Sequence, residues 1–234
     1  MPRKKKIEGQ GEKPAERGSA MDAEPLRLEH PEQLPNRRPL DKYRTPSFCT
    51  AALIESYPEI RGDLFVDPCA GDCRMRDAMS AALRFPDWLT NDIDVEERSV
   101  MGHCDATSPD FWALAAGAAH QKRAWVVTNP PFLLATSIAL QAIETVGNVA
   151  LLLRSTWLEP AKDRQWLGRM PPRAMLVLPR FSFIGGGSDQ AGCHWMLWGD
   201  VEPGIKVWTG KPGQLQLFGG GVPRAGSRRE SAPA

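Results

Sequence analysis

The chain has 234 residues, of which 42% are hydrophobic, and this is enough to build one domain with its own core. Its formal net charge is only +1, so any surface that attracts a polyanion has to be local. The sequence has no signal-peptide pattern and no apolar run of membrane length. We therefore expect a soluble, cytoplasmic protein with no membrane partner.

The five cysteines are an odd number, which does not favour a disulfide framework. They form no Cys-x-x-Cys pair, and no histidine lies at ligand spacing from them. The sequence therefore predicts neither disulfides nor a metal site, and it fits a reducing compartment.

The two ends of the chain differ in composition from its middle. Residues 1–40 are polar, rich in Pro and Glu, and begin with the basic run Arg3-Lys4-Lys5-Lys6, so they predict a disordered arm. That run favours either a solubilising tail or a contact with phosphates. We expect a folded domain over 41–208 and a flexible Gly/Pro-rich tail over 209–234.

The middle of the chain alternates short apolar runs with helical patterns. The apolar runs predict seven strands, at 64–67, 88–92, 101–105, 124–128, 149–154, 174–179 and 194–198. Helical patterns lie between them, at 46–56, 74–83, 109–119 and 133–146. This alternation predicts an α/β fold with a doubly wound, mostly parallel sheet.

The predicted strand 124–128 runs directly into Asn129-Pro130-Pro131-Phe132. The two prolines fix the backbone and remove two N–H donors, so the Asn129 side chain and the Pro130 carbonyl are acceptors beside an aromatic ring. Ligands of open α/β sheets bind at this end of the strands. A plain Asn-Pro turn that closes a strand is the simpler interpretation.

The motif resembles the catalytic motif of S-adenosylmethionine-dependent methyltransferases that act on planar nitrogens, chiefly the adenine-N6 DNA methyltransferases. The resemblance implies that Asn129 and Pro130 accept hydrogen bonds from the target amine, while Pro131 and Phe132 contact a base flipped out of DNA. It also implies the Rossmann-like class I fold, a seven-stranded sheet of order 3-2-1-4-5-7-6 whose last strand is antiparallel.

The stretch after the first predicted strand resembles the cofactor loop of this family. Gly71 lets the backbone approach a bulky ligand, and Asp67 at the strand tip can attract the positive charge of S-adenosylmethionine. Cys69 and Ala70 line the same loop. The family usually has a second glycine two residues after the first, where this chain has Cys73.

Acidic residues follow the next two predicted strands. Asp92 can accept both ribose hydroxyls of the cofactor, with Ile93 against the adenine and Asp94 as the alternative acid. Asp105 matches the family's third acidic position, which receives the adenine amino group. Each acid by itself is also a common cap or loop carboxylate.

Thr45 and Pro46 open the first predicted helix, with Thr45 as the expected N-cap. In the γ-ordered adenine methyltransferases, a Thr-Pro helix precedes the cofactor loop and its threonine contacts the methionine part of the cofactor. The motif order here is similar, so the resemblance covers about residues 43–198.

Two further stretches carry aromatic and basic side chains. Arg180, Phe181 and Phe183 lie where the family supplies the other wall of the base pocket, although core packing is an equal alternative for either ring. Arg154 and Trp157 follow the fifth strand and begin a polar insertion that can contact phosphates and bases. Core packing is the simpler interpretation of the tryptophan.

Three alternatives to a DNA methyltransferase stay open. Glutamine-N5 methyltransferases of release factors use Asn-Pro-Pro-Tyr, and guanine-N2 methyltransferases of ribosomal RNA use Asn-Pro-Pro-Phe, commonly with a duplicated domain. An inactive nucleic-acid-binding relative is the third. The chain has no separate target-recognition domain, so we expect a short or relaxed target sequence, as in phage, mobile-element or restriction-modification enzymes.

The segment Gln214-Leu215-Gln216-Leu217-Phe218 resembles the motif by which bacterial replication proteins dock on the sliding clamp. Such a motif in a flexible tail can fold onto a preformed groove. The alternative is that its apolar residues pack back on the domain as an edge strand.

Overall fold

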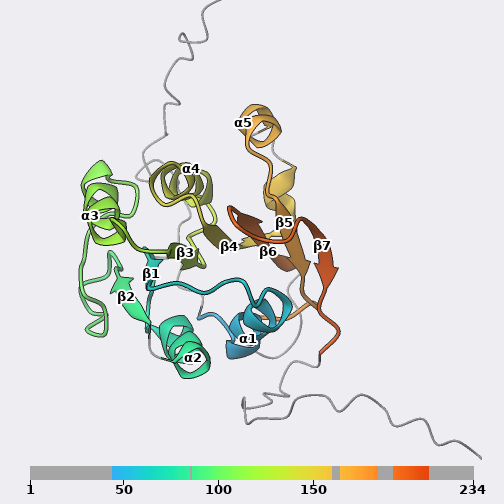
Figure 1. Cartoon of the computed structure of the whole chain (residues 1–234), viewed down its shortest axis with the longest axis horizontal. Coiled ribbons are helices and arrows are strands. Elements are labelled where there is room, and N and C mark those ends of the chain that lie inside the picture. Colours follow the sequence, from blue (N-terminus) through green and yellow to red (C-terminus); the bar gives the residue numbers. More distant parts are fainter. Residues whose placement is uncertain (1–43, 85, 160–163, 184–191, 211–234) are drawn as a thin grey trace, which may run out of the picture. The chain divides into compact units, whose positions relative to one another are not determined.

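The computed structural model describes residues 44–84, 86–159, 164–183 and 192–210. The predicted arm 1–40, and the predicted tail apart from residues 209 and 210, lie outside these ranges. The described residues form one sheet with helices on both of its faces (Figure 1).

The sheet has the spatial order β2-β1-β3-β4-β6-β5-β7. Its strands are β1 (Leu64–Asp67), β2 (Asp87–Thr90), β3 (Ala124–Thr128), β4 (Val149–Arg154), β5 (Ala174–Val177), β6 (Cys193–Trp198) and β7 (Gly204–Val207). β6 runs antiparallel to its neighbours β4 and β5, and the other pairs are parallel. The predicted Rossmann-like α/β sheet is thus confirmed, with the antiparallel strand inserted where the order 3-2-1-4-5-7-6 places it.

The strand predicted at 101–105 is wrong. Only an isolated parallel bridge between Asn91 and Gly102 forms there. The Asn91 side chain instead bonds the backbone of Cys104, donating to its carbonyl at 2.9 Å and accepting from its N–H at 2.8 Å. The Asn91 side chain therefore bonds the backbone that an edge strand would otherwise pair with. Met101 is 72% exposed, so this segment does not bury an apolar face there.

The strand β7 was not predicted from the sequence. It extends the sheet beyond β5, and three of its four residues are exposed. The alternation of Ile205 and Val207 is short and is not buried, so it does not by itself mark a strand.

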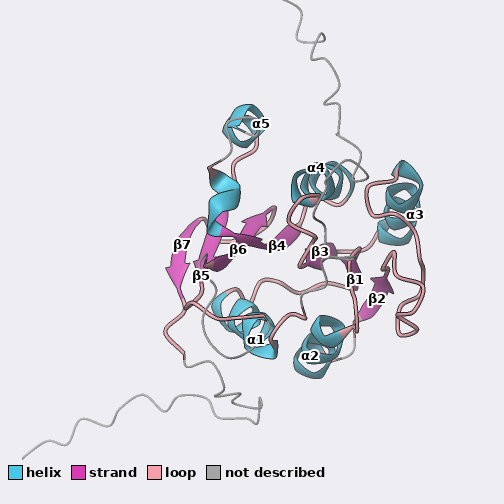
Figure 2. Cartoon of the chain, turned by 180° about the vertical axis from the view of Figure 1, so that it is seen from behind, coloured by secondary structure: helices cyan, strands magenta, loops and turns pink. Residues whose placement is uncertain are grey.

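The helices cover the sheet in two layers (Figure 2). α1 (Ser47–Ser56) and α2 (Arg74–Leu83) lie on one face, and α3 (Pro109–Ala119) and α4 (Ala135–Thr145) lie on the other. The 3-10 helix η2 (Ser155–Leu158) and α5 (Arg164–Arg169) follow β4. None of the helices in the described ranges is long and apolar enough to cross a membrane.

Strand side chains alternate between the two layers of the core. In β3, Trp125 and Val127 join the cluster that includes α1 and α2, whereas Ala124 and Val126 join the cluster of α3 and α4. β1 and β4 divide their side chains in the same way. These strands are buried on both faces, as their continuous apolar runs predict.

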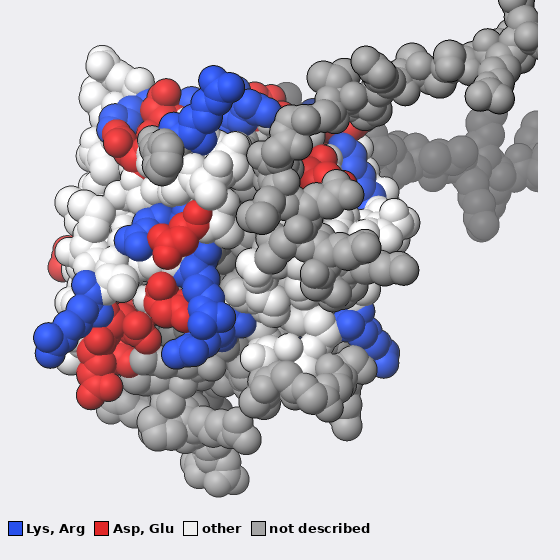
Figure 3. All heavy atoms as spheres, turned by 90° about the horizontal axis from the view of Figure 1, so that it is seen from below, with Lys and Arg blue, Asp and Glu red and all other residues white. Residues whose placement is uncertain are grey.

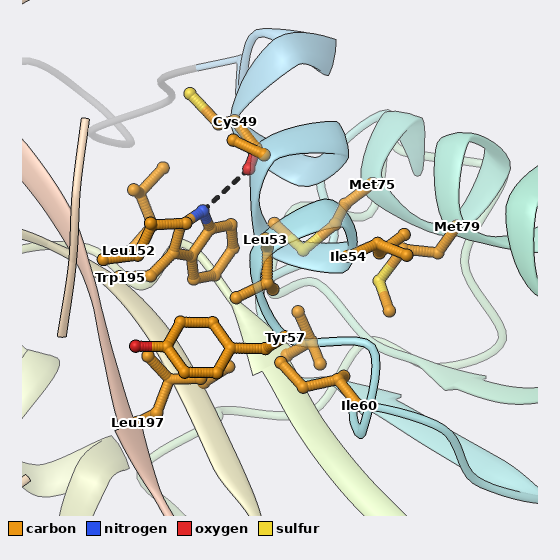
Figure 4. Packing of buried hydrophobic residues seen from close by; sticks show 14 of the residues in the cluster. Cys49, Leu53, Ile54, Tyr57, Ile60, Met75, Met79, Leu152, Trp195 and Leu197 are labelled. Carbon is orange, nitrogen blue, oxygen red and sulfur yellow. Dashed lines mark hydrogen bonds between the residues drawn. The ribbon is translucent and has the colours of Figure 1, made fainter. Parts of the chain in front are cut away.

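Trp195 of β6 joins the second half of the sheet to the first helix. Its fully buried indole Nε1 donates to the carbonyl of Cys49 at 2.8 Å (Figure 4). Leu53 and Tyr57 of the α1 region pack around it in the same cluster. A single side chain thus fixes α1 against β6, 146 residues later in the sequence.

We expect Trp195→Ala to lower the free energy of unfolding by about 3–5 kcal/mol, because it leaves a cavity and removes the donor of a buried carbonyl. Urea denaturation followed by circular dichroism measures the loss. Leu114→Ala, at a leucine that is 55% exposed, is the control and should change stability by less than about 0.5 kcal/mol. Equal losses in both variants would contradict this account of the core.

Candidate functional site

The predicted site residues collect at one edge of the sheet. β2, β1 and β3 are parallel neighbours, so their carboxyl ends lie side by side. β1 ends at Asp67, β2 is followed by Asn91 and Asp92, and β3 is followed by Asn129. The cofactor loop, the second acid and the Asn-Pro-Pro-Phe motif are therefore brought together, as the strand assignments predict.

The loop between β1 and α2 contacts the second acid directly. The N–H of Gly71 donates to Asp92 Oδ2 at 2.8 Å, and the N–H of Asp94 donates to Asp92 Oδ1 at 3.0 Å. Gly71 has a positive φ of 51°, and a Cβ placed on it would meet no atom within 4 Å. The backbone therefore faces open space at Gly71, where a bulky ligand has room.

Asn91 is a site residue that the sequence analysis missed. It is 1% exposed, and its Nδ2 donates to the Pro68 carbonyl at 3.0 Å as well as to Cys104. One amide thus ties the loop after β1 to the segment after β2. An asparagine directly before the strand-tip acid was the available signal.

Cys73, which stands where the predicted cofactor loop would have a second glycine, adopts a backbone conformation that favours glycine. Its φ is 60°, in the left-handed region, and its thiol donates to the Ser99 carbonyl at 3.4 Å. A non-glycine residue there costs about 1–2 kcal/mol. The loop therefore adopts a left-handed turn at Cys73 without a glycine there.

Three predicted acids surround Cys69. Burial raises the pKa of the Cys69 thiol well above its ordinary value, and the negative charges of Asp67, Asp92 and Asp105 raise it further. Asp105 itself is exposed, and its Oδ1 accepts from the N–H and the hydroxyl of Thr107, both at 2.8 Å. The charges of Asp67, Asp92 and Asp105 thus all affect the same thiol, that of Cys69.

Asp67 is the most buried of these acids, at 1% exposure. Burial raises its pKa to about 7, and the charge of Asp92 adds to the shift, while the N–H of Cys69, bonded at 3.2 Å, opposes it. A carboxyl group with this pKa gains or loses its proton near neutral pH, and a bound cation nearby would favour the charged form.

Asp67 also makes stability depend on pH. Its folded pKa of about 7 lies above the value of about 4 in an unfolded chain. The folded state therefore holds an extra proton between these values, and stability decreases as the pH rises from about 4 to about 7. We expect Asp67→Asn to remove this decrease, so that the variant gains stability over the wild type across that window.

Urea denaturation of both proteins at several pH values from 4 to 8 measures the difference. Asp110→Asn, at an exposed carboxylate, is the matched control and should follow the wild-type curve. Parallel curves for the wild type and Asp67→Asn would contradict the raised pKa.

Thr45 holds the Asn129 amide and is not the N-cap of α1. The N-cap position is taken by Pro46, and no side chain caps the helix. The Thr45 hydroxyl instead accepts a hydrogen bond from Asn129 Nδ2 at 3.2 Å. With Nδ2 bonded to Thr45, the other end of the amide, Oδ1, is a hydrogen-bond acceptor.

Aromatic rings form the wall beside this amide. Phe132 lies 6.3 Å from Phe183, and Phe183 lies 4.9 Å from Phe181, measured between ring centroids. All three rings are partly buried and pack on the α1 side of the core, and a role in a base pocket stays a prediction. The guanidinium of Arg154 lies over Phe132, 4.2 Å from the ring centroid, a contact worth about 0.5–2 kcal/mol.

The other predicted residues take different positions. Ile93 is 55% exposed and Arg180 is exposed, so both are accessible to a ligand. Trp157 is buried and packs edge-on against Trp198 at 6.3 Å, which confirms core packing for this tryptophan.

Ser155 and His194 form a pair that the sequence analysis missed. The N–H of Leu178 donates to His194 Nδ1 at 3.4 Å, so the ring proton is on Nε2, which donates to Ser155 Oγ at 3.0 Å. The Ser155 hydroxyl then donates to the Gly192 carbonyl at 2.9 Å. Burial lowers the pKa of His194, which favours this neutral form.

The described charges are mixed on the face that carries α1 and α2. Figure 3 shows blue and red side chains interspersed there, without a broad region of one sign. Ion pairs near the start of α2 are of this kind, joining Asp72 to Arg44 and Arg74 and Asp77 to Arg76. The small net charge is thus distributed and not concentrated on this face.

The sequence matches no protein-family model and no curated protein. Among solved structures, the fold is similar to that of a "putative class I S-adenosylmethionine-dependent methyltransferase" from Listeria monocytogenes, with 10% identity and a TM-score of 0.42. The similarity covers 69% of this chain and 61% of that protein's length. The proposed function therefore rests on the residues of this chain.

Proposed function

We propose that the protein transfers a methyl group from S-adenosylmethionine to the N6 amino group of adenine in DNA. The observation that carries this proposal is the Asn129 amide, oriented by Thr45 at the carboxyl end of β3. It lies on the same edge as Asp67 and as Asp92 with its Gly71 contact. An acceptor beside a loop with room for a nucleoside suits transfer to a planar nitrogen.

The chain offers a set of groups that fits S-adenosylmethionine. The open space at Gly71 leaves room for the ligand, and the carboxylates of Asp67 and Asp92 suit its ammonium and ribose groups. Exposed Ile93 offers an apolar contact for adenine, and Asp105 an acceptor for its amino group. When bound, the cofactor supplies the methyl group.

The protein's own contribution is to orient the target amine. The Asn129 Oδ1 and the Pro130 carbonyl accept its two N–H groups, which favours a pyramidal nitrogen whose lone pair is available for attack. Phe132 and Pro131 stack on the flipped base, and Phe181, Phe183 and Arg180 form the opposite wall. A general base with a tuned pKa is not required in this scheme.

The arrangement around Thr45 supports an adenine methyltransferase of the γ order. The Thr-Pro segment precedes the cofactor loop in sequence and contacts the catalytic asparagine in space.

Incubation with labelled S-adenosylmethionine and DNA, RNA or release factor, followed by identification of the methylated product, tests the substrate. N6-methyladenine in DNA supports the proposal, whereas N2-methylguanine in RNA or N5-methylglutamine identifies one of the alternative activities.

We expect Asn129→Ala to lower the methylation rate by at least about a hundredfold, because it removes the acceptor proposed for the reacting amine. Thr45→Val should lower the rate about fivefold, since it removes only the bond that orients the amide. Rates come from single-turnover methylation and cofactor affinity from calorimetry.

Asp92→Asn is the contrasting variant, because its side chain faces the cofactor loop and not the amine. It should weaken cofactor binding by about 1.5–3 kcal/mol, while Asn129→Ala leaves cofactor binding nearly unchanged. Full activity in Asn129→Ala would disprove the mechanism.

We also propose that the segment 214–218 recruits the enzyme to a bacterial sliding clamp, and thereby to newly replicated DNA. The support is its sequence, Gln-Leu-Gln-Leu-Phe, because the segment lies outside the described residues. A fluorescent peptide spanning 211–221 should bind purified clamp with a micromolar dissociation constant. The same peptide with Leu217 and Phe218 changed to Ala is the control, and equal binding by both peptides would refute recruitment.

A further inference from the structure

The guanidinium of Arg154 lies over the ring of Phe132, on which the target base is expected to stack. Arg154 is the last residue of β4, and β4 is the parallel neighbour of β3, so its side chain emerges at the same edge as the Asn-Pro-Pro-Phe motif. Its guanidinium lies 4.2 Å from the centroid of Phe132. A flat cation therefore covers the aromatic ring.

The backbone at Arg154 is held from the opposite side by β6. Arg154 pairs with Cys193, and the N–H of Ser155 donates to the Gly192 carbonyl at 2.8 Å. The Ser155 hydroxyl bonds the same carbonyl and the ring of His194. The side chain of Arg154 can therefore change its direction while its Cα stays fixed at the edge of the site.

A guanidinium can bind two kinds of partner at this site. It stacks on aromatic rings, and its fork of N–H groups binds the oxygens of a phosphate. A flipped nucleotide carries a flat base that competes for Phe132, and its phosphate stays attached nearby. When the base displaces the guanidinium of Arg154 from Phe132, the guanidinium can therefore bind the phosphate of the same nucleotide.

We propose that Arg154 is a substrate-binding residue of the base pocket: it covers Phe132 in the free protein and moves to a backbone phosphate of the flipped nucleotide when the base takes its place. This role rests on the proposed function, because it requires a nucleic-acid substrate. Phosphate contacts position the substrate without reading its sequence, which agrees with a short or relaxed target.

The test compares Arg154→Met, Arg154→Lys and Arg84→Met in the full-length protein. Arg84→Met is the matched control, since Arg84 is exposed and follows α2, near the opposite edge of the sheet where β2 begins. Binding of an adenine-containing duplex is measured by fluorescence anisotropy at several salt concentrations, together with single-turnover methylation and thermal unfolding.

We expect Arg154→Met to weaken duplex binding about tenfold and to reduce the slope of log affinity against log salt by about 1. Arg154→Lys keeps a charge for the phosphate and should retain the wild-type slope, and so should the Arg84→Met control. A merely structural role in packing Phe132 would change the methylation rate and the melting temperature without changing the slope.

The outcomes separate this role from the proposed function. A wild-type protein that methylates DNA, together with an Arg154→Met variant of wild-type salt slope, overturns the role of Arg154 alone. The role of Arg154 is also overturned if Arg84→Met reduces the salt slope of duplex binding while Arg154→Met leaves it unchanged. A wild-type protein that neither binds nor methylates DNA overturns the proposed function and this role with it.

Discussion

Burial of β1, β3 and β4 on both faces is the constraint on which the rest of the structure depends. A polar side chain inside such a strand loses its contact with water, at a cost of several kcal/mol unless it is fully bonded. Polar groups therefore stand at the strand ends, as Asn129 and Arg154 do, and Asp67, which is buried at the end of β1, has a raised pKa. Because the three strands are parallel neighbours, these ends fall on one edge, and the candidate site follows from the way the core is built.

Much of the fold could be predicted because burial leaves a periodic signal. The helices α2 and α3 and the strands β1, β3 and β4 have the predicted bounds, since continuous apolar runs mark strands buried on two faces. The placement of Asp67, Asp92 and Asn129 on one edge required only that each follow or end a parallel strand. Where burial is missing, the sequence is ambiguous: the short alternation of β7 does not mark a strand, and the pattern at 101–105 forms only an isolated bridge.

Side-chain partners could not be predicted in the same way. Thr45 fits an N-cap locally, and its bond to Asn129, 84 residues later, depends on where α1 meets the end of β3. The Ser155–His194 pair likewise depends on the register of β4 and β6, and the Asn91 amide depends on how the loops after β1 and β2 meet. The left-handed Cys73 is opposed by local preference, and it forms because the surrounding loop fixes the backbone there.

The insertion of β6 between β4 and β5 also sets the order in which the protein can fold during synthesis. β1 to β4 pair with one another within residues 64–154, so the edge that holds Asp67 and Asn129 can assemble before β5 to β7 are made. β5 pairs only with β6 and β7, and the far edge of β4 stays open until β6 emerges from the ribosome. An open, apolar strand edge is prone to pair with other chains. The nascent chain is therefore most exposed to aggregation while residues 155–192 are being translated.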